Sequence, residues 1–312
     1  MTDMQRWPEL PYDAWKDTCQ TLQLWTQVVG KVKLRLSPFL NELWNSGFHL
    51  TTRGLTTGVM PYGGRGLEVR FDFVDHNVSV LSSDGGTKIM PLMPRSVADF
   101  YAEFMGVLRS LGVDVAITTQ PVETPVQTHF DVDREHASYD PEYVNRWWRI
   151  MLGTEMVLQK YRSPFVGKSS PVLFYWGSFD LAEARYSGRP GPTINGPRFF
   201  QVAEDQENIA CGFWAGNPTA AGIELGEPAF YSYTNPAPPG FGEATVRPSA
   251  ASFRKALGEF VLLYRDVRVA ASPDDAILTF FQSAYEVGAD LGHWDRSKLE
   301  QTPPTPFEHP HS

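Results

Sequence analysis

The chain of 312 residues is 42% hydrophobic and 13% aromatic, which is enough apolar sequence to bury a large core in one domain or two. Its formal net charge of −9 argues against a nucleic-acid partner, because binding to a phosphate backbone draws on clustered Lys and Arg. Two cysteines, Cys19 and Cys211, are too few for a disulfide framework or a zinc knuckle.

The first half of the chain predicts a helix, a run of antiparallel strands and a second helix. The first helix begins with Asp13 as its N-cap and closes at Gly30. Ser96 caps the second helix, whose apolar stripe ends at Gly112. Turn signals separate the strand-like segments between them, which are FHLTTRGL, LEVRFDFV, NVSVLSS and TKIMPL.

The second half repeats that order with additions. Asp140 and Pro141 start a long helix, since Pro is favoured at the first helical position. Three strand-like segments follow: VLFYWGSFDLAEARYSGR, ENIACGFW and PAFYSYT. An insertion rich in Gly, Pro and Asn runs from Gly188 to Pro197, and an extra helix starts at Asp274.

Short matching fragments suggest that the two halves are related. VGK occurs at 29–31 and again at 166–168, and each copy precedes a strand, FHL at 48–50 or FDL at 179–181. PRSVADF at 94–100 also resembles RPSAASF at 247–253, and each is expected to open a helix. Fixed-order self-similarity of this kind is the signature of a repeated unit.

These patterns predict an α+β fold made of two related units, each a helix, an antiparallel meander and a helix, with an extra C-terminal helix. The units would span residues 1–120 and 140–300, joined by a connecting loop at 121–139. The Pro-rich tail at 301–312 is predicted to be disordered.

Several longer motifs carry a resemblance to a known family. They are WPELPYDAWKDTCQTLQLWTQVVGK, RGLTTGVMPYGG, DREHASYD, SPVLFYWGSFDLAEARYSGR and SAYEVGADLGHWDR. Taken together, these motifs resemble a bacterial family of unknown function, the domain of unknown function 5996 family, over nearly the whole chain. The resemblance implies no activity, so function has to be argued from the residues.

The segment Val172–Arg189 raises the question of why Asp180 follows a cluster of aromatic residues, because a carboxylate in apolar surroundings is costly unless it is paired or functional. If the segment is one unbroken strand, Trp176, Ser178 and Asp180 share a face. Gly177 then marks a bulge or a close approach. Asp180 is predicted to be buried and to pair with Arg185 or Arg189.

Arg185 and Arg189 also suggest an anion site at the end of this strand, although paired or solvated arginines are the commoner case. Trp214, Tyr231 and Tyr233 add aromatic side chains that could line the same pocket as Trp176 and Ser178. The predicted ligand-binding set therefore consists of Trp176, Ser178, Asp180, Arg185, Arg189, Trp214, Tyr231 and Tyr233.

Two histidines are further catalytic candidates beside Asp180. The alignment of FHL with FDL places His49 opposite Asp180 in the two units, where an imidazole held by a carboxylate would serve as a general base. His136 lies in the loop HFDVDREHASYD, whose density of His and carboxylates resembles a metal site but lacks a recognisable ligand spacing, so no metal is assigned. Locally satisfied side chains are the alternative for both histidines.

The sequence leaves two classes of function open. In the first, the protein binds a small molecule in an aromatic pocket with a buried carboxylate and arginines, and whether it is also an enzyme stays open. In the second, it is an interaction or structural protein whose aromatic residues fill a core or an oligomer interface. No signal peptide or membrane helix is apparent, so a cytoplasmic protein with no membrane partner is expected. Cofactor and oligomeric state are undetermined.

Overall fold

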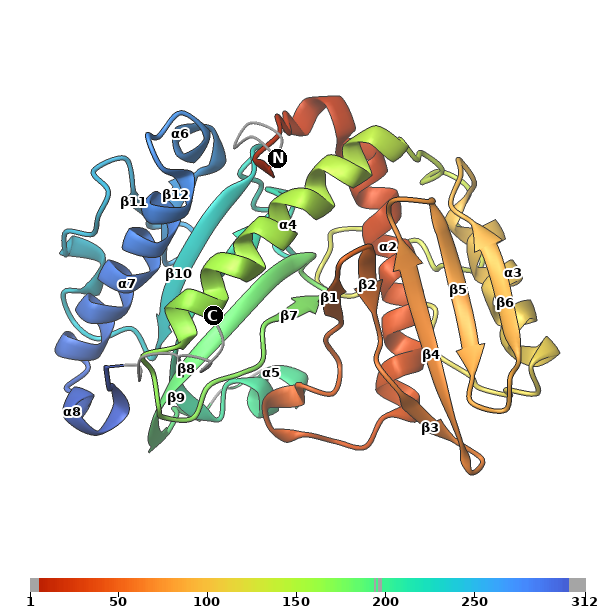
Figure 1. Cartoon of the computed structure of the whole chain (residues 1–312), viewed down its shortest axis with the longest axis horizontal. Helices are drawn as coiled ribbons and strands as arrows, with labels where there is room; N and C mark the ends of the chain where they lie inside the picture. The colour runs from red at the N-terminus through yellow and green to blue at the C-terminus, as the bar shows by residue number, and fades with distance from the viewer. Residues whose placement is uncertain (1–5, 194, 196–197, 303–312) are drawn as a thin grey trace, which may run out of the picture.

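Two antiparallel sheets lie side by side in the computed structural model, which describes residues 6–193, 195 and 198–302 (Figure 1). The first sheet has the order β1 (His49–Thr51), β2 (Gly54–Thr56), β4 (Arg65–Asp72), β5 (Asn77–Ser82) and β6 (Thr87–Pro91), with β3 (Met60–Tyr62) also paired to β4. The second has the order β11 (Ser252–Arg254), β12 (Glu259–Leu263), β10 (Ala229–Asn235), β9 (Gln206–Trp214), β8 (Asp180–Pro190) and β7 (Leu173–Tyr175). The two sheets meet where the backbones of Phe48 and Phe174 exchange hydrogen bonds of 2.8 Å beside β1 and β7.

Helices cover these sheets. The longer ones are α2 (Tyr12–Leu36), α3 (Val97–Ser110), α4 (Pro141–Arg162) and α7 (Pro273–Leu291), and the shorter ones are α5 (Arg198–Ala203), α6 (Tyr264–Arg268) and α8 (Arg296–Leu299). In Figure 1, α4 and α7 lie in front of the second sheet, whereas α2 and α3 lie behind the first. Mixed helices and antiparallel sheets confirm the α+β prediction. In the described part of the chain, no helix is long and apolar enough to span a membrane.

The predicted helix starts at Ser96 and Asp140 are confirmed. The predicted N-cap Asp13 is wrong, because α2 begins at Tyr12 with Pro11 in the capping position. The Ser96 hydroxyl accepts a hydrogen bond of 3.1 Å from the Asp99 amide at the start of α3. The Asp140 carboxylate accepts bonds from the Glu142 and Tyr143 amides, with Pro141 as the first residue of α4. Capping depends on residues adjacent in sequence, which is why sequence alone identified it.

The predicted end of the first helix at Gly30 is wrong. Gly30 lies inside α2, which continues to Leu36. A Cβ atom at Gly30 would lie 2.4 Å from atoms of the Trp176 indole, so the glycine allows that ring to lie against the helix. A glycine required by a close contact looks the same in sequence as one that ends a helix.

One hydrophobic core runs through both halves, with Trp147 of α4 near its centre. Trp147 stacks on Phe179 at 4.6 Å between ring centroids and also contacts Trp15, Phe73 and Phe174. These rings come from α2, the first sheet and the second sheet. Burial of one shared core therefore holds the two halves together.

The fragments that suggested a repeat do not occupy equivalent places. The first VGK lies within α2, whereas the second lies in the loop after α4. Ser96 opens a helix, but 247–253 leads into the short strand β11. The internal duplication is not shown by these matches, although both halves run helix, meander, helix.

Two other predictions concern loops and the tail. In PYGGRG, Gly63 and Gly64 have φ values of 54° and 81° between β3 and β4, as a tight hairpin turn requires. Residues 121–139 contain no helix or strand. The predicted disordered tail falls, from residue 303 onward, outside the described residues.

Candidate functional site

The segment Val172–Arg189 forms a hairpin, so the prediction of one unbroken strand is wrong. β7 ends at Tyr175 and β8 begins at Asp180, with the Phe179 amide donating to the Tyr175 carbonyl at 2.8 Å across the turn. Phe179 has a φ of 65°, a conformation unfavourable for a residue with a side chain. The reversal directs Trp176 toward Gly30 of α2. Its indole N–H donates to the carbonyl of Ser46, in the segment before β1, at 2.8 Å.

Asp180 is buried, as predicted, but it does not pair with an arginine. Asp180 is 8% exposed. Its carboxylate accepts hydrogen bonds from the hydroxyls of Ser178 and Tyr231. Burial raises the pKa of Asp180, and these two hydrogen bonds oppose the rise. Two neutral donors therefore replace the expected ion pair.

The two arginines of β8 lie elsewhere because side chains alternate between the faces of a strand. Arg185 is 1% exposed on the face toward α4 and α7, where it donates to the Tyr161 carbonyl and lies 3.4 Å from the centroid of that ring. Arg189 pairs with Glu207 at 2.6 Å. Neither borders the cavity beside Asp180, so the arginines of the predicted pocket are not there.

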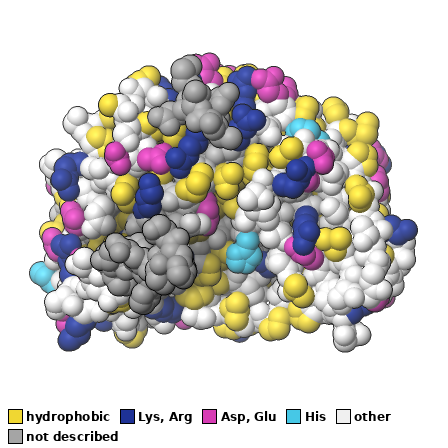
Figure 2. All heavy atoms as spheres, in the orientation of Figure 1, with side chains coloured by type: hydrophobic (Ala, Val, Ile, Leu, Met, Phe, Trp, Pro, Cys, Tyr) yellow, Lys and Arg dark blue, Asp and Glu magenta, His cyan; other side chains and the backbone are white. Residues whose placement is uncertain are grey.

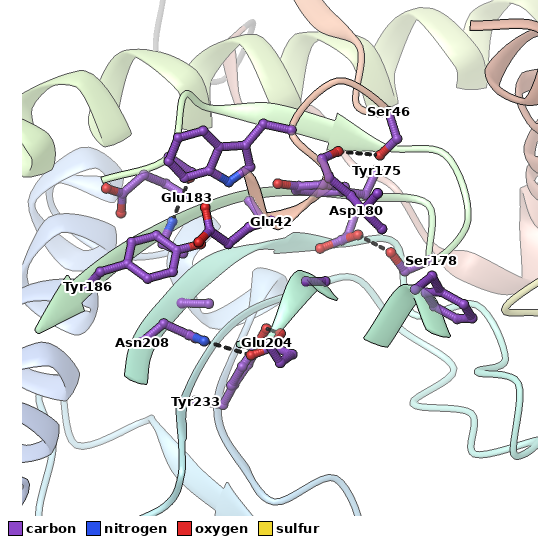
Figure 3. Close-up of a pocket in the computed structure, with 18 of the residues that line it drawn as sticks. Glu42, Ser46, Tyr175, Ser178, Asp180, Glu183, Tyr186, Glu204, Asn208 and Tyr233 are labelled. Carbon is purple, nitrogen blue, oxygen red and sulfur yellow. Dashed lines mark hydrogen bonds between the residues drawn. The ribbon is translucent and has the colours of Figure 1, made fainter. Parts of the chain in front are cut away.

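A cavity of about 200 Å³ lies against Asp180, and we call it the acidic cavity (Figure 3). The carboxylate-bearing residues Glu42, Glu123, Asp180 and Glu204 come from four separate segments of the chain and line it. Its aromatic lining consists of Trp44, Tyr175, Tyr186, Phe199, Tyr231 and Tyr233. Among the described residues, no Lys, Arg or His borders this space.

Burial makes the carboxylates of this cavity hard to ionise. Burial, with the charge of Asp180 adding to it, raises the pKa of Glu123 to about 7. Burial also raises the pKa of Glu42, against the opposing effect of Lys168, which pairs with it. Like charges brought together without a cation inside the cavity raise one another's pKa.

Some acceptor atoms of the cavity lining lack hydrogen-bond donors. Glu42 and Asn208 are 4% and 3% exposed, yet Oε2 of Glu42 and Oδ1 of Asn208 have no hydrogen-bond partner among the residues described. The side-chain nitrogen of Asn208 donates to Glu204 at 2.6 Å, whereas the side-chain oxygen of Asn208 accepts no hydrogen bond. A ligand that donates hydrogen bonds would satisfy these two buried acceptors.

Glu183 borders the acidic cavity but belongs to the opposite face of the sheet. Its carboxylate lies 3.7 Å from Nε of Arg162 in α4, and its side chain is fully buried. Burial raises the pKa of Glu183 to about 7, with Arg185 and Arg162 opposing the rise. Glu183 and Arg185 thus form a buried charge cluster behind the cavity wall.

The other predicted site residues lie in three different places. Ser178, Tyr231 and Tyr233 line the acidic cavity with Asp180, whereas Trp176 lines a neighbouring one. Trp214 packs with Tyr231 and Ala182 without bordering either space.

The two histidines do not lie with Asp180. His49 is exposed on β1 of the first sheet, whereas Asp180 opens β8 of the second. The carboxylate of Asp180 accepts hydrogen bonds from Ser178 and Tyr231 and makes none with His49. Nδ1 of His136 lies 2.8 Å from Asp133, whose backbone carbonyl accepts a hydrogen bond from Ala98 at the start of α3.

Metal ligands do not gather in the parts of the chain that the structure describes, since no group of three or more His, Cys, Asp or Glu side chains is placed to hold an ion. The loop HFDVDREHASYD uses its side chains locally instead. Asp133 binds His136, Arg134 binds Asp99, and His129 contacts Thr119 at 2.8 Å.

A model of a family of unknown function, DUF5996, matches residues 7–301. The chain belongs to this family. No curated protein and no solved structure matches it. The match confirms the resemblance found in the sequence, and membership in DUF5996 assigns no activity, so the acidic cavity is the basis for a functional argument.

Sequence reasoning missed most of the acidic cavity of this DUF5996 chain. Glu42 lies in a 3-10 helix (Asn41–Leu43), Glu123 in a loop and Glu204 directly after α5, and their convergence on Asp180 depends on long-range folding. Glu42 and Glu123 do carry the same signal as Asp180, since each is a single acid within apolar or Pro-rich sequence, LNELW or PVETP. Applied to every such acid, that criterion would have found two of the three.

Proposed function

We propose that the acidic cavity binds a small organic cation with N–H donors, such as a primary amine. Several carboxylates surround this space together with aromatic rings, and among the described residues no basic side chain borders it. This arrangement is the main support for the proposal. An ammonium group interacts favourably with ring faces as well as with carboxylates, and it supplies the donors that the free oxygens of Glu42 and Asn208 require.

The small-molecule hypothesis is favoured over an interaction or structural role by the geometry around Asp180. A closed ion pair without a cavity would have favoured the structural role. Asp180 instead accepts hydrogen bonds from two neutral hydroxyls and lies in the wall of a cavity. The partner in this proposal is a cationic ligand, in place of the anionic group that the arginines suggested.

Binding is tested with n-butylamine, and with n-butanol and butyrate as neutral and anionic controls of the same length. We expect only the amine to raise the thermal unfolding temperature in a concentration-dependent way, because a ligand that binds the folded state stabilises it. Asp180→Asn is expected to weaken amine binding by about 10–30-fold, the effect of losing a charged hydrogen bond. Titration calorimetry provides the affinities.

Glu207→Gln is the matched control, because Glu207 pairs with Arg189 outside the cavity. It is expected to bind the amine like the parent protein. Equal stabilisation by the amine, the alcohol and the carboxylate would contradict the proposal, as would equal losses in the two variants.

Amine affinity is expected to increase as the pH rises from about 6 to about 8. Below its folded pKa of about 7, Glu123 is neutral and offers the cation no charge, and above it the carboxylate is ionised. The amine stays protonated over this pH range, since an alkylammonium has a pKa of about 10.4. Glu123→Gln should flatten the profile, and an affinity that falls over this range in the parent protein would argue against a cation next to Glu123.

The internal duplication remains a proposal that element order alone supports. Both halves run from a long helix through a meander of neighbouring strands to a second helix. Superposition of residues 12–110 on 141–291 tests it, and a match of the two meanders in the same strand order is the expected result. The division into two units at 1–120 and 140–300 also remains a proposal. Because the two units share one core, they would depend on each other in folding.

A further inference from the structure

A second cavity, of about 510 Å³, adjoins the acidic cavity, and we call it the apolar cavity. The two spaces share wall residues, which are Leu43, Ser46, Glu123, Tyr175 and Phe199. The shared wall includes Glu123, whose carboxylate lies so near Gly177 that a Cβ atom there would be 2.1 Å from its Oε1. One ligand could therefore contact both spaces on either side of the Glu123 side chain.

The apolar cavity differs chemically from its neighbour. Its lining is mainly hydrophobic and includes Leu34, Ile117, Val122 and Trp176. The basic residues Lys31 and Arg35 also border it, so an ammonium group is disfavoured here and favoured in the acidic cavity. Leu34 is 41% exposed at its edge. Water in contact with these side chains is readily displaced by hydrocarbon, so this space favours an uncharged apolar group.

Unfavourable backbone conformations are concentrated at the junction of the cavities. Glu42, Leu43 and Glu123 have φ values of 47°, 57° and 53°, and all three line one or both spaces. Such conformations cost energy and persist where the surrounding structure holds them, which is common at ligand-binding sites. Three residues with positive φ angles at this junction favour a preformed site there.

Cavity size indicates how a ligand uses the two spaces. Pockets for small molecules usually measure about 300–1,000 Å³. The acidic cavity, at about 200 Å³, is below that range, whereas the apolar cavity is within it. A polar head in the first and an apolar body in the second would match both the volumes and the linings.

We propose that the ligand is an elongated amphipathic amine, with its ammonium group in the acidic cavity and its hydrocarbon chain in the apolar cavity. This inference rests on the proposed function, because the acidic cavity has to bind the cation. The apolar cavity then determines which amines bind well, and affinity increases with chain length until the hydrocarbon fills the space.

The test is a series of n-alkylamines from ethylamine to octylamine, measured by titration calorimetry at about pH 8, with n-alkanols of equal length for comparison. Each methylene group is expected to tighten amine binding by about fourfold, the effect of burying one CH₂. Leu34→Gln should weaken octylamine binding by about fivefold and leave ethylamine unchanged. Gln keeps the helical propensity of α2, and the site is partly exposed, so folding is preserved.

Leu291→Gln is the matched control, because Leu291 is 37% exposed at the end of α7, away from both cavities. It should leave the whole series unchanged. Amine binding that does not depend on chain length would overturn the amphipathic ligand and leave the cation site in place. Alkanols that bind as tightly as amines would overturn the cation site, and the absence of binding by any compound would overturn both.

Discussion

Replacing Arg185 with Met is expected to lower the free energy of unfolding by about 2–3 kcal/mol, the range for leaving a buried acceptor without its charged donor. Arg185 is 1% exposed and lies over the rings of Tyr161 and Tyr285, at 3.4 and 4.3 Å from their centroids. Its charge also opposes the rise in the pKa of the buried Glu183. Met preserves much of the side-chain volume, so the loss comes mainly from the Tyr161 carbonyl, which loses its donor. Glu183 keeps Arg162 at 3.7 Å but loses the opposing charge of Arg185.

This loss is expected to grow as the pH rises above about 7. Below the folded pKa of Glu183, about 7, the carboxyl is neutral in the parent protein and in the variant, so the missing charge matters least. Above it, Arg185 stabilises the ionised form in the parent protein alone. Urea unfolding followed by circular dichroism at about pH 5.5 and about pH 8 measures both losses.

Arg189→Met is the matched control from the same strand. Arg189 is exposed and pairs with Glu207, so its loss is expected to cost less than about 1 kcal/mol, with little dependence on pH. Similar losses for the two arginines would contradict this account of β8. A loss in the Arg185 variant that shrinks at higher pH would exclude Glu183 as the cause.

Gly30→Ala is expected to lower the free energy of unfolding by about 2–3 kcal/mol. Ala improves helix propensity by about 1 kcal/mol, but its Cβ would lie 2.4 Å from the Trp176 indole. The ring then has to move out of a well-packed site and give up its hydrogen bond to the Ser46 carbonyl. Overpacking and the lost bond together outweigh the gain in propensity.

Gly106→Ala provides the opposite result in the same experiment. Gly106 lies inside α3, and a Cβ atom there would have as its nearest neighbour the end of the Arg109 side chain at 3.8 Å. The substitution is expected to stabilise the protein by up to about 1 kcal/mol. If both alanines stabilise, Trp176 does not determine the need for glycine at position 30. Thermal and urea unfolding measure both.

Local signals correctly predicted the starts of α3 and α4 and the tight turn between β3 and β4. Ser96, Asp140 and the glycines of PYGGRG act on backbone groups two or three residues away, so their effect is already written in neighbouring positions. The failures at Gly30 and at 247–253 have one origin. A glycine or a Ser-x-x-x-Phe pattern has several structural uses, and distant contacts select among them.

The candidate site shows the same division. A lone acid among aromatic residues indicated that Asp180 is buried, because desolvation depends on nearby apolar side chains that share its strand or turn. Its partners were predicted wrongly. Tyr231 is about fifty residues away in sequence and reaches Asp180 only because β9 places β8 and β10 on either side of it.

Composition, spacing and capping residues thus predicted an α+β chain with a buried carboxylate at Asp180, and the longer motifs carried the resemblance to DUF5996 that the family match confirms. Which charges surround that carboxylate depended on folding. The turn at Phe179 separates Trp176 from Asp180, the alternation along β8 puts Arg185 on the helix-covered face, and loops bring Glu42 and Glu123 to the cavity. A change of one residue in strand phase moves a side chain to the other face of a sheet, so the sign of charge in a pocket is a property of the assembled strands and loops.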